Sequence, residues 1–376
     1  MFRKHNISLV ISTMRSGGAE RVMSKLANYF ASKGHNVTLI TFVPPSEKPF
    51  YTLDERITQL PLNQLNFNES KLIRLKNIVK SLFTLRSTFK KRSPDVVISF
   101  METVNVATLL AGYKLGIPTI VSERIDPKYH ILYPIKIQKL FNKLRCSLYH
   151  CASALVAQTQ SALDFFPKSI QDHAVIIPNP VNTPEYKNYA VSEDVQHIIA
   201  VGRLCIQKDH VTLIKAFAKL QEKYSTLKLT IYGEGPERAN LEKLILDLNL
   251  TDCIFLPGTT ADIDQKLFKS DMFVFPSLYE GFPNALCEAM AIGLPVIGSD
   301  CSGNVDVIQH NDNGIIFKQK DVDGLYDQML ILVKDLSLRK HLSIQAQKIS
   351  IDYSEDKIYS KWDRLLENIQ KTGDQI

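Results

Sequence analysis

The chain has 376 residues, more than one hydrophobic core usually supports, so we expect two domains. Its 45% apolar residues, 22% charged residues and net charge of +6 are typical of a globular protein and exclude a disordered one. No apolar stretch approaches the roughly 20 residues of a membrane-spanning helix, and the start MFRKHNISLVIST lacks a cleavage site, so we expect a cytoplasmic protein without a signal peptide.

Short apolar runs rich in β-branched residues alternate along the chain with segments of helical spacing. The predicted strands are residues 7–12, 37–42, 96–100, 118–122, 154–158 and 175–178, then 197–202, 228–232, 254–257, 272–276, 295–298 and 315–317. Nearly continuous apolar strands that alternate with helices indicate parallel sheets covered on both faces. The sequence therefore predicts an α/β protein with two Rossmann-like, doubly wound units of six strands each.

A proline-rich segment, PNPVNTPEYKNYAVSED, lies between the two sets of strands and predicts the domain boundary. We expect an N-terminal domain over residues 1–182 and a C-terminal domain over residues 183–352. Residues 353–376 are expected to form a helix that packs back toward the N-terminal domain, because Ile358, Trp362 and Leu366 fall on one stripe. Two such units that face each other form an interdomain cleft at the carboxyl ends of their strands.

The motif MRSGGAER follows the first predicted strand and opens a helix. Gly17 and Gly18 permit a tight turn and a close approach of a ligand, and the helix start offers backbone N–H groups to an anion. A purely structural turn explains the same two glycines equally well.

The N-terminal half is strongly basic, with 24 Lys and Arg against 11 Asp and Glu in residues 1–183. Such a surplus predicts an acidic partner: phosphates, an anionic membrane surface or nucleic acid. Much of it lies in residues 69–94, where Lys71, Arg74 and Lys80 flank apolar residues at helical spacing. A basic amphipathic helix of this kind rests on anionic membranes or holds lipid phosphates, although a solvated outer helix fits the pattern as well.

Two motifs of the C-terminal half follow predicted strands. In VGRLCIQKDH, Arg203 and Lys208 lie where a strand opens into the cleft, so they match the charge of a diphosphate better than that of solvated surface residues. In IYGEGPER, Gly233 and Gly235 resemble a dinucleotide fingerprint, but Arg238 stands in place of the third glycine. Hydride transfer is therefore weakly indicated, and loop flexibility around a nucleotide explains the glycines as well.

The segment PSLYEGFPNALCEAM places Glu280 in a loop and Glu288 inside a helix. The first-turn N–H groups of Asn284, Ala285 and Leu286 are candidates to bind a phosphate. Glu288 is suited to accept hydrogen bonds from ribose hydroxyls and Glu280 from those of a sugar. The alternative for each glutamate is a solvated acid.

No convincing metal site is present in the sequence. The triplets Asp262-Ile-Asp264 and Asp321-Val-Asp323 precede apolar helical runs, so helix capping is favoured over metal binding. The six cysteines lack C-x-x-C spacing, which argues against zinc and against a disulfide framework.

Taken together, GGAER, GR-x4-K, YGEGPE and E-x7-E resemble the retaining glycosyltransferases of family 4, which have the GT-B fold of two facing Rossmann-like domains. The resemblance implies a nucleotide-diphosphate sugar as the donor, with no cofactor and no metal. It assigns catalysis to Arg203, Lys208 and Glu280. The residues that it implies for donor binding are Gly17, Gly18, Arg203, Lys208, Glu234, Glu280, Asn284, Ala285, Leu286 and Glu288.

The segments SGGAER and SER-x-DP and the basic helix look like transferases that extend polyprenyl-diphosphate-linked glycans at the bacterial inner membrane. This resemblance implies a protein that is peripheral on the inner face of the cytoplasmic membrane. The acceptor-binding candidates are Lys71, Arg74, Lys80, Glu123 and Arg124. Ser122-Glu123-Arg124 stands where many members have a histidine, so no catalytic histidine is assigned.

The function that the sequence predicts is transfer, with retention, of a hexose or N-acetylhexosamine from a UDP-sugar to a lipid-linked or free glycan in polysaccharide or glycoprotein assembly. We expect front-face displacement, in which the leaving diphosphate accepts the acceptor's proton. The expected partners are the nucleotide sugar, the glycan acceptor and an anionic membrane, and not nucleic acid. The alternatives are a nicotinamide-dependent oxidoreductase and a non-enzymatic protein that binds anionic surfaces.

Overall fold

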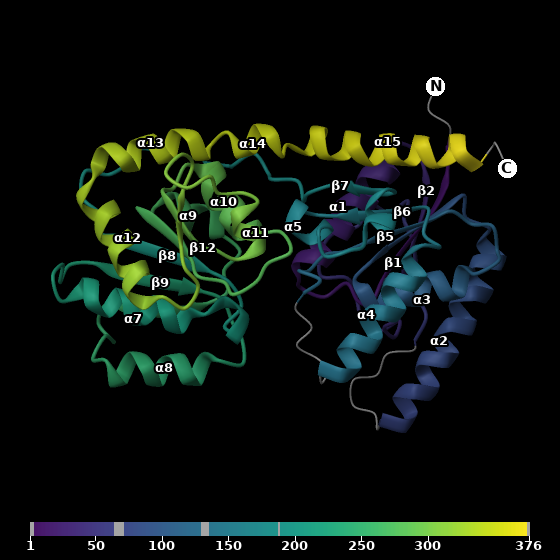
Figure 1. The fold of residues 1–376 in the computed structure, drawn as a ribbon, viewed down its shortest axis with the longest axis horizontal. Helices are drawn as coiled ribbons and strands as arrows, with labels where there is room; N and C mark the ends of the chain where they lie inside the picture. The colour runs from purple at the N-terminus through teal and green to yellow at the C-terminus, as the bar shows by residue number, and fades with distance from the viewer. Residues whose placement is uncertain (1–3, 64–70, 129–134, 187–188, 374–376) are drawn as a thin grey trace. The chain divides into compact units, whose positions relative to one another are not determined.

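The computed structural model describes residues 4–63, 71–128, 135–186 and 189–373 (Figure 1). The chain forms two compact units. Unit 1 comprises Met1–Asn179 and Ile358–Ile376, and unit 2 comprises Pro180–Lys357. The first division falls between Asn179 and Pro180, slightly before the position expected after residue 182, and unit 1 takes up the chain again at Ile358.

Unit 1 is built on a parallel sheet with the strand order β3-β2-β1-β4-β5-β6-β7. Its strands are β1 (Asn6–Ile11), β2 (Asn36–Thr41), β3 (Thr58–Pro61), β4 (Val96–Phe100), β5 (Thr119–Ser122), β6 (Ala154–Ala157) and β7 (Ala174–Ile176). The prediction of six strands was wrong here, because the described residues form seven. The additional strand, β3, is a half-exposed edge strand of sequence TQLP, which has no apolar run to mark it.

Helices alternate with the strands of unit 1, as the predicted fold requires. They are α1 (Gly18–Ser32), α2 (Lys71–Arg92), α3 (Glu102–Gly112), α4 (Ile135–Tyr149), α5 (Gln160–Leu163) and α6 (Lys168–Gln171). The central strands are buried on both faces, as the fully buried VVISF sequence of β4 illustrates. Burial of such side chains contributes roughly 1.5–3 kcal/mol each.

Unit 2 repeats the architecture with the parallel order β10-β9-β8-β11-β12-β13. Its strands are β8 (His197–Val201), β9 (Lys228–Tyr232), β10 (Ile254–Gly258), β11 (Met272–Phe275), β12 (Val296–Ser299) and β13 (Ile315–Phe317). Its helices are η1 (Ile206–Lys208), α7 (His210–Gln221), α8 (Arg238–Asp247), α9 (Ile263–Phe268), α10 (Asn284–Ile292), α11 (Ser302–Val305), α12 (Val322–Lys334), α13 (Leu336–Ala346) and α14 (Ile349–Asp352). The six predicted strands are confirmed.

The last helix, α15 (Glu355–Gly373), packs on unit 1 through the apolar stripe read from the sequence. Trp362 is buried, with its ring centroid 6.4 Å from that of Phe100 at the end of β4. The Tyr29 hydroxyl of α1 donates to Asp363 Oδ2 at 2.6 Å, and the Tyr29 ring stacks on Tyr359 at 4.3 Å. Unit 1 is the surface that this helix covers.

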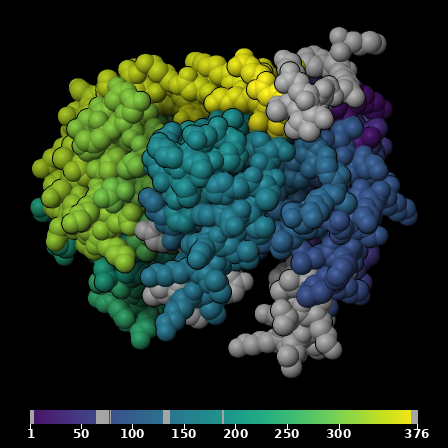
Figure 2. All heavy atoms as spheres, turned by 45° about the vertical axis from the view of Figure 1, so that its right-hand side comes forward, coloured from purple at the N-terminus to yellow at the C-terminus, as the bar shows by residue number. Residues whose placement is uncertain are grey.

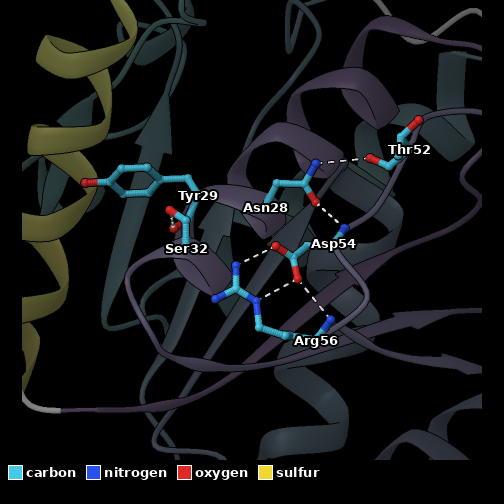
Figure 3. A network of polar contacts seen from close by, with 6 residues as sticks. All are labelled: Asn28, Tyr29, Ser32, Thr52, Asp54 and Arg56. Carbon is cyan, nitrogen blue, oxygen red and sulfur yellow. Dashed lines mark hydrogen bonds and ion pairs between the residues drawn. The ribbon is translucent and has the colours of Figure 1, made fainter.

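A polar network anchors the segment before β3 to α1 (Figure 3). Asn28 donates to the Thr52 carbonyl at 3.0 Å and accepts from the Asp54 amide at 2.8 Å. The Arg56 guanidinium forms a two-pronged contact with Asp54, at 2.8 and 2.6 Å, and these hydrogen bonds lower the pKa of Asp54 to about 2. The network thereby fixes the edge strand that has little apolar surface of its own.

Candidate functional site

The candidate site of unit 2 lies where its strand order reverses direction. From β8 the chain proceeds outward to β9 and β10, and then returns to place β11 on the other side of β8. At such a switch point the loops after the two central strands separate, and ligands bind in the resulting crevice. Arg203 and Lys208 follow β8, and Glu280 follows β11, so the predicted residues come together at the switch point.

Lys208 and Glu280 contact each other directly. The Lys208 Nζ lies 2.5 Å from Glu280 Oε1, and both side chains are largely buried. The Lys208 ammonium also lies 4.4 Å from the ring centroid of Phe275, the last residue of β11. The sequence predicted separate roles for the lysine and the glutamate, whereas the structure places them in one charged pair.

Backbone contacts join the two loops that carry this pair. The Leu278 amide donates to the Gln207 carbonyl at 2.8 Å, and the Gln207 side chain donates to the Tyr279 carbonyl at 2.8 Å. These reciprocal hydrogen bonds fix Lys208 and Glu280 relative to each other without requiring a ligand.

Arg203, in the loop that follows β8, is exposed to solvent. Among the residues that the structure describes, its guanidinium makes no hydrogen bond or ion pair. Five N–H donors without protein partners on a fixed loop suit an incoming anion such as a diphosphate.

The glycines of IYGEGPER bring the loop after β9 against the loop of Arg203. A Cβ atom at Gly233 would lie 1.9 Å from the Gly202 carbonyl oxygen, and one at Gly235 would lie 2.3 Å from that of Leu204. The Leu204 amide donates to the Glu234 carbonyl at 3.0 Å. Close backbone packing, and not loop flexibility or a dinucleotide fingerprint, explains these glycines.

The Glu234 side chain is engaged with Arg238. The two groups form an ion pair of 2.5 Å together with a second contact of 2.8 Å, and these contacts lower the pKa of Glu234. The Glu234 side chain is exposed. A nucleotide-sugar donor that binds Glu234 must therefore contact it from the solvent side, where it is paired with Arg238.

Helix α10 begins after Pro283 and contains Glu288, as expected. Glu288 is partly buried, and Asn284 occupies the first position of the helix. Within the described part of the chain, the amides of Ala285 and Leu286 have no hydrogen-bond partner, whereas that of Cys287 donates to the Pro283 carbonyl at 3.0 Å. Two first-turn donors thus remain for an anion.

Two residues that the sequence analysis did not identify, Gly303 and Asn304, help to position Glu280 and the end of the strand that precedes it. A Cβ at Gly303 would lie 2.6 Å from the Glu280 Cβ, so α11 rests directly against the glutamate. The buried Asn304 side chain donates to the Ser299 carbonyl at 3.1 Å and to the Phe275 carbonyl at 3.4 Å, which links the ends of β11 and β12. The only signal available beforehand was the run Ser-Gly-Asn just after a strand.

His210 is buried at the start of α7, two residues after Lys208. Burial, followed by the neighbouring charge of Lys208, lowers the pKa of His210 to about 4. The imidazole is therefore neutral at neutral pH and adds no charge to the crevice.

The two D-x-D triplets differ in the structure. Asp321 caps α12 by accepting from the Gly324 amide at 2.9 Å, which confirms the capping prediction. Asp262 occupies the corresponding position before α9, but its side chain makes no capping hydrogen bond, so the prediction was wrong there. Among the described residues no group of three or more His, Cys, Asp or Glu side chains is arranged to hold a metal ion.

In unit 1, Gly17 is the N-cap of α1 and Gly18 is its first residue, at the carboxyl end of β1. A Cβ at Gly17 would lie 2.2 Å from Glu20 Oε2, and the Tyr51 hydroxyl donates to the Gly17 carbonyl at 3.0 Å. The space beside Gly17 that was expected to admit a ligand is therefore occupied by the Glu20 side chain.

Glu123 is buried within unit 1, and its acceptor-binding prediction is not compatible with that position. Its carboxylate accepts from the Tyr149 hydroxyl and lies 3.6 Å from the Arg145 guanidinium, and both partners are also buried. Asn105 donates to the Tyr149 oxygen at 3.0 Å and continues the network into the sheet. These partners enclose the carboxylate, so Glu123 offers no exposed surface to a glycan.

Arg124 connects several parts of unit 1. Its guanidinium lies 3.7 Å from the Phe100 ring centroid and 5.8 Å from that of Trp362, and its Nη1 donates to Asn179 Oδ1 at 2.9 Å. Burial lowers the pKa of Arg124 to about 9. The side chain therefore joins the end of β4, α15 and the last residue before unit 2.

The remaining acceptor candidates lie on α2. Lys80 is exposed on this helix. Lys71 and Arg74 belong to its first turns, but their side chains lie outside the described residues, so their predicted role stays a prediction.

Two family descriptions match the chain, one for each sheet. Residues 16–185 match the description "Glycosyltransferase Family 4", and residues 183–349 match "Glycosyl transferases group 1". This chain is a glycosyltransferase, and each of its two sheets matches one of these descriptions. The oxidoreductase and the non-enzymatic binding protein are therefore not supported as readings of the two Rossmann-like units.

A relative of this glycosyltransferase occurs in Campylobacter jejuni. It is the α-1,4-N-acetyl-D-galactosaminyltransferase named for GalNAc-α-(1→4)-GalNAc-α-(1→3)-diNAcBac-PP-undecaprenol, and it is 28% identical over 370 residues, which cover 97% of this chain and 99% of the relative. An uncharacterised glycosyltransferase of Haemophilus influenzae is also 28% identical, over 93% of this chain and 96% of its own length.

Among solved structures, Anabaena HepE in complex with UDP matches the glycosyltransferase with a TM-score of 0.77 at 18% identity, over 96% of this chain and 100% of that one. Its likeness shows the fold and confirms the predicted GT-B class. In the described part of the chain, no helix combines the length and the apolar character needed to cross a membrane.

Proposed function

We propose that this glycosyltransferase moves a hexose or N-acetylhexosamine from a UDP-sugar to a polyprenyl-diphosphate-linked glycan, with retention of the anomeric configuration. The observation that carries the proposal is the Lys208–Glu280 pair beside the unpartnered guanidinium of Arg203, at the switch point of unit 2. The UDP in the Anabaena structure supports the choice of nucleotide. The undecaprenol-linked substrate in the name of the Campylobacter enzyme supports the choice of acceptor.

In this proposal Arg203 and Lys208 bind the donor diphosphate, assisted by the free amides at the start of α10. Glu288 accepts hydrogen bonds from the ribose and Glu280 from the donor sugar. Since Glu280 already contacts Lys208, binding of the sugar and binding of the diphosphate are linked through one ion pair. Fixed cations aimed at the charge that develops on a leaving group stabilise the transition state without reorganisation.

The chemical step that we propose is a front-face displacement. The bond between the anomeric carbon and the diphosphate oxygen breaks, and the acceptor oxygen forms its bond to the same face of that carbon. The acceptor's hydroxyl proton passes to the leaving diphosphate. Neither protein carboxylate forms a covalent intermediate, and the cations supply the neutralisation that a metal supplies elsewhere.

The proposal is tested by offering UDP-, GDP- and ADP-sugars to the purified protein, first for hydrolysis and then with polyprenyl-diphosphate glycans. We expect release of UDP that accelerates when the acceptor is added, a product with the donor's anomeric configuration by NMR, and unchanged rates in EDTA. Inversion of configuration, or a rate that is lost in EDTA and restored by a divalent cation, would contradict the mechanism. Transfer from GDP- or ADP-sugars alone would contradict the assigned donor.

A further inference from the structure

Three hydroxyl side chains lie next to one another across the first three strands of unit 1. Ser8 of β1 is paired in register with Thr38 of β2, and Thr38 is paired in turn with Thr58 of β3. Side chains at paired positions of neighbouring parallel strands lie on the same face of the sheet. In a doubly wound fold both faces are usually apolar and covered by helices, so this hydroxyl row departs from the pattern.

Helix α2 covers the adjacent row of the same face. Two residues further along each strand, the side chains are apolar: Val10, Ile40 and Leu60. They pack in one hydrophobic core with Leu85 and Phe89 of α2, and Figure 2 shows the blue atoms of α2 and α3 at the molecular surface. The helix ends at Arg92, about one turn beyond Phe89. Its apolar side chains therefore cover the apolar row, and its basic end meets the hydroxyl row.

A cavity of about 270 Å³ is lined by the hydroxyl row together with Asn36, Arg56 and Arg92. Ser8 is 2% exposed, and its hydroxyl makes no hydrogen bond with any residue that the structure describes. A buried hydroxyl without a partner is unfavourable, so it favours a ligand or water in the cavity. The volume lies below the roughly 300–1,000 Å³ of pockets for drug-sized molecules, which indicates a small ligand.

The charges around this cavity favour an anion. Arg56 binds Asp54 through Nε and Nη2, at 2.8 and 2.6 Å, and its third nitrogen, Nη1, points away from that carboxylate (Figure 3). The Arg92 guanidinium makes no hydrogen bond or ion pair with the described part of the chain. No described aspartate or glutamate lines the cavity, and the nearby Asp95 carboxylate accepts from the Asn6 amide at 2.7 Å.

We propose that this cavity binds the phosphate group of a small anion. Arg92 and the Nη1 of Arg56 donate to the phosphate oxygens, and the three hydroxyls supply further hydrogen bonds. The last turn of α2 carries three basic residues, Lys90, Lys91 and Arg92, which offset the partial negative charge of the helix end. A bound phosphate would thus join three strands to the end of α2 and stabilise unit 1.

This anion site is separate from the predicted donor site. The paired hydroxyls lie near the starts of their strands, at the amino edge of the sheet. Helix α1, with Gly17 and Gly18, follows β1 and therefore begins at the opposite edge. The proposal goes beyond the proposed function and does not depend on it.

The test is thermal unfolding of the full chain in rising concentrations of inorganic phosphate, at constant ionic strength, with chloride as the reference salt. An anion that binds only the folded state raises Tm as its concentration rises, and the titration yields Kd. Arg92→Gln should weaken phosphate binding at least about tenfold, because hydrogen bonds between charged groups are strong. Ser8→Ala should weaken it about threefold.

Glucose 1-phosphate is titrated in parallel with inorganic phosphate. Tighter binding of the ester, lost in Arg92→Gln, would assign the site to a phosphorylated sugar. Equal or weaker binding of the ester would assign it to free phosphate.

The matched control is Lys91→Gln, because Lys91 is exposed on the same turn of α2 but does not line the cavity. Its Kd for phosphate should stay within about twofold of the original value. Arg203→Ala should leave the part of the stabilisation that depends on Arg92 unchanged.

The proposal is overturned if phosphate raises Tm no more than chloride does, if Lys91→Gln weakens binding as much as Arg92→Gln, or if Arg203→Ala alone abolishes the effect. The last outcome would place the phosphate in the donor site. Phosphate binding that depends on Arg92, in a chain that transfers no sugar, would leave this proposal standing and refute the proposed function alone.

Discussion

The Lys208 ammonium lies 2.5 Å from the Glu280 carboxylate, so two residues assigned to different parts of the donor form one unit before any donor binds. We predict that Lys208→Ala lowers kcat/KM by on the order of 10²- to 10³-fold, because a fixed cation at the leaving group is lost. Residues in direct contact do not act independently. The Lys208→Ala/Glu280→Ala variant should therefore lose clearly less than the product of the two single losses in steady-state transfer assays.

The ion pair between Lys219 and Asp323 provides the control, since it lies in the same unit but is exposed. Lys219→Ala should leave kcat/KM within about twofold of the original protein, since solvent screens an exposed ion pair. Fully multiplicative losses at Lys208 and Glu280 would show that the pair observed here does not persist in the reacting complex.

The substitutions Arg203→Ala and Asp321→Ala should have opposite effects on turnover and on stability. Arg203→Ala removes an unpartnered guanidinium of the site, so we predict a large fall in turnover with little change in stability. Asp321→Ala removes the cap of α12, so we predict a loss of about 1 kcal/mol in the free energy of unfolding with turnover preserved. Urea titrations and transfer kinetics on both variants check this; retention of full rate by Arg203→Ala would refute its assignment.

Gly235 sets the position of the loop that carries Arg203. A methyl group there would meet the Leu204 carbonyl oxygen at 2.3 Å, so Gly235→Ala should displace this backbone and cost about 1–3 kcal/mol of stability. We also expect weaker binding of UDP by calorimetry. Gly112→Ala in α3 is the control, since its Cβ meets only Thr119 at 3.7 Å and alanine favours a helix; similar effects of both variants would argue against close packing as the reason for Gly235.

The buried imidazole of His210 predicts a pH dependence of stability. Its pKa is lowered to about 4 in the folded chain, against an ordinary value of 6.5, so the unfolded state binds a proton first as the pH falls. The free energy of unfolding should therefore decrease between about pH 6.5 and pH 4, by up to about 3 kcal/mol. His210→Gln should flatten this dependence in urea titrations at pH 7 and pH 5, whereas the exposed His341→Gln should retain it.

Much of the fold could be predicted because the central strands are buried on both faces and read as continuous apolar runs. β4 and β11 are examples, with the sequences VVISF and MFVF. β3 could not be predicted in this way, because an edge strand that is half exposed carries no such run. Helix α10 ends at Gly293, which adopts a φ of 104°, a conformation for which glycine is the usual residue.

From the sequence, the candidate site could be predicted only as a set of suitable residue types at the ends of predicted strands. The contacts between those residues could not be predicted. The pairing of Lys208 with Glu280 depends on β8 and β11 being neighbours, which is a property of the sheet order and not of either loop. Glu123 was misjudged because its partners, Arg145 and Tyr149, come from a distant helix that the motif does not include. The role of Asn304 was missed for the same reason, since its carbonyl partners lie at the ends of two strands.

Because unit 1 includes Ile358–Ile376, its polypeptide is interrupted by all of unit 2. During translation the second unit leaves the ribosome as one continuous stretch, while the first still lacks Trp362 against Phe100 and Arg124. A nascent chain that ends before Ile358 therefore contains every residue of unit 2. In the same chain, the surface of unit 1 around Phe100 and Arg124 is not yet covered by α15. Completion of the earlier-synthesised half is deferred until the residues of α15 are made.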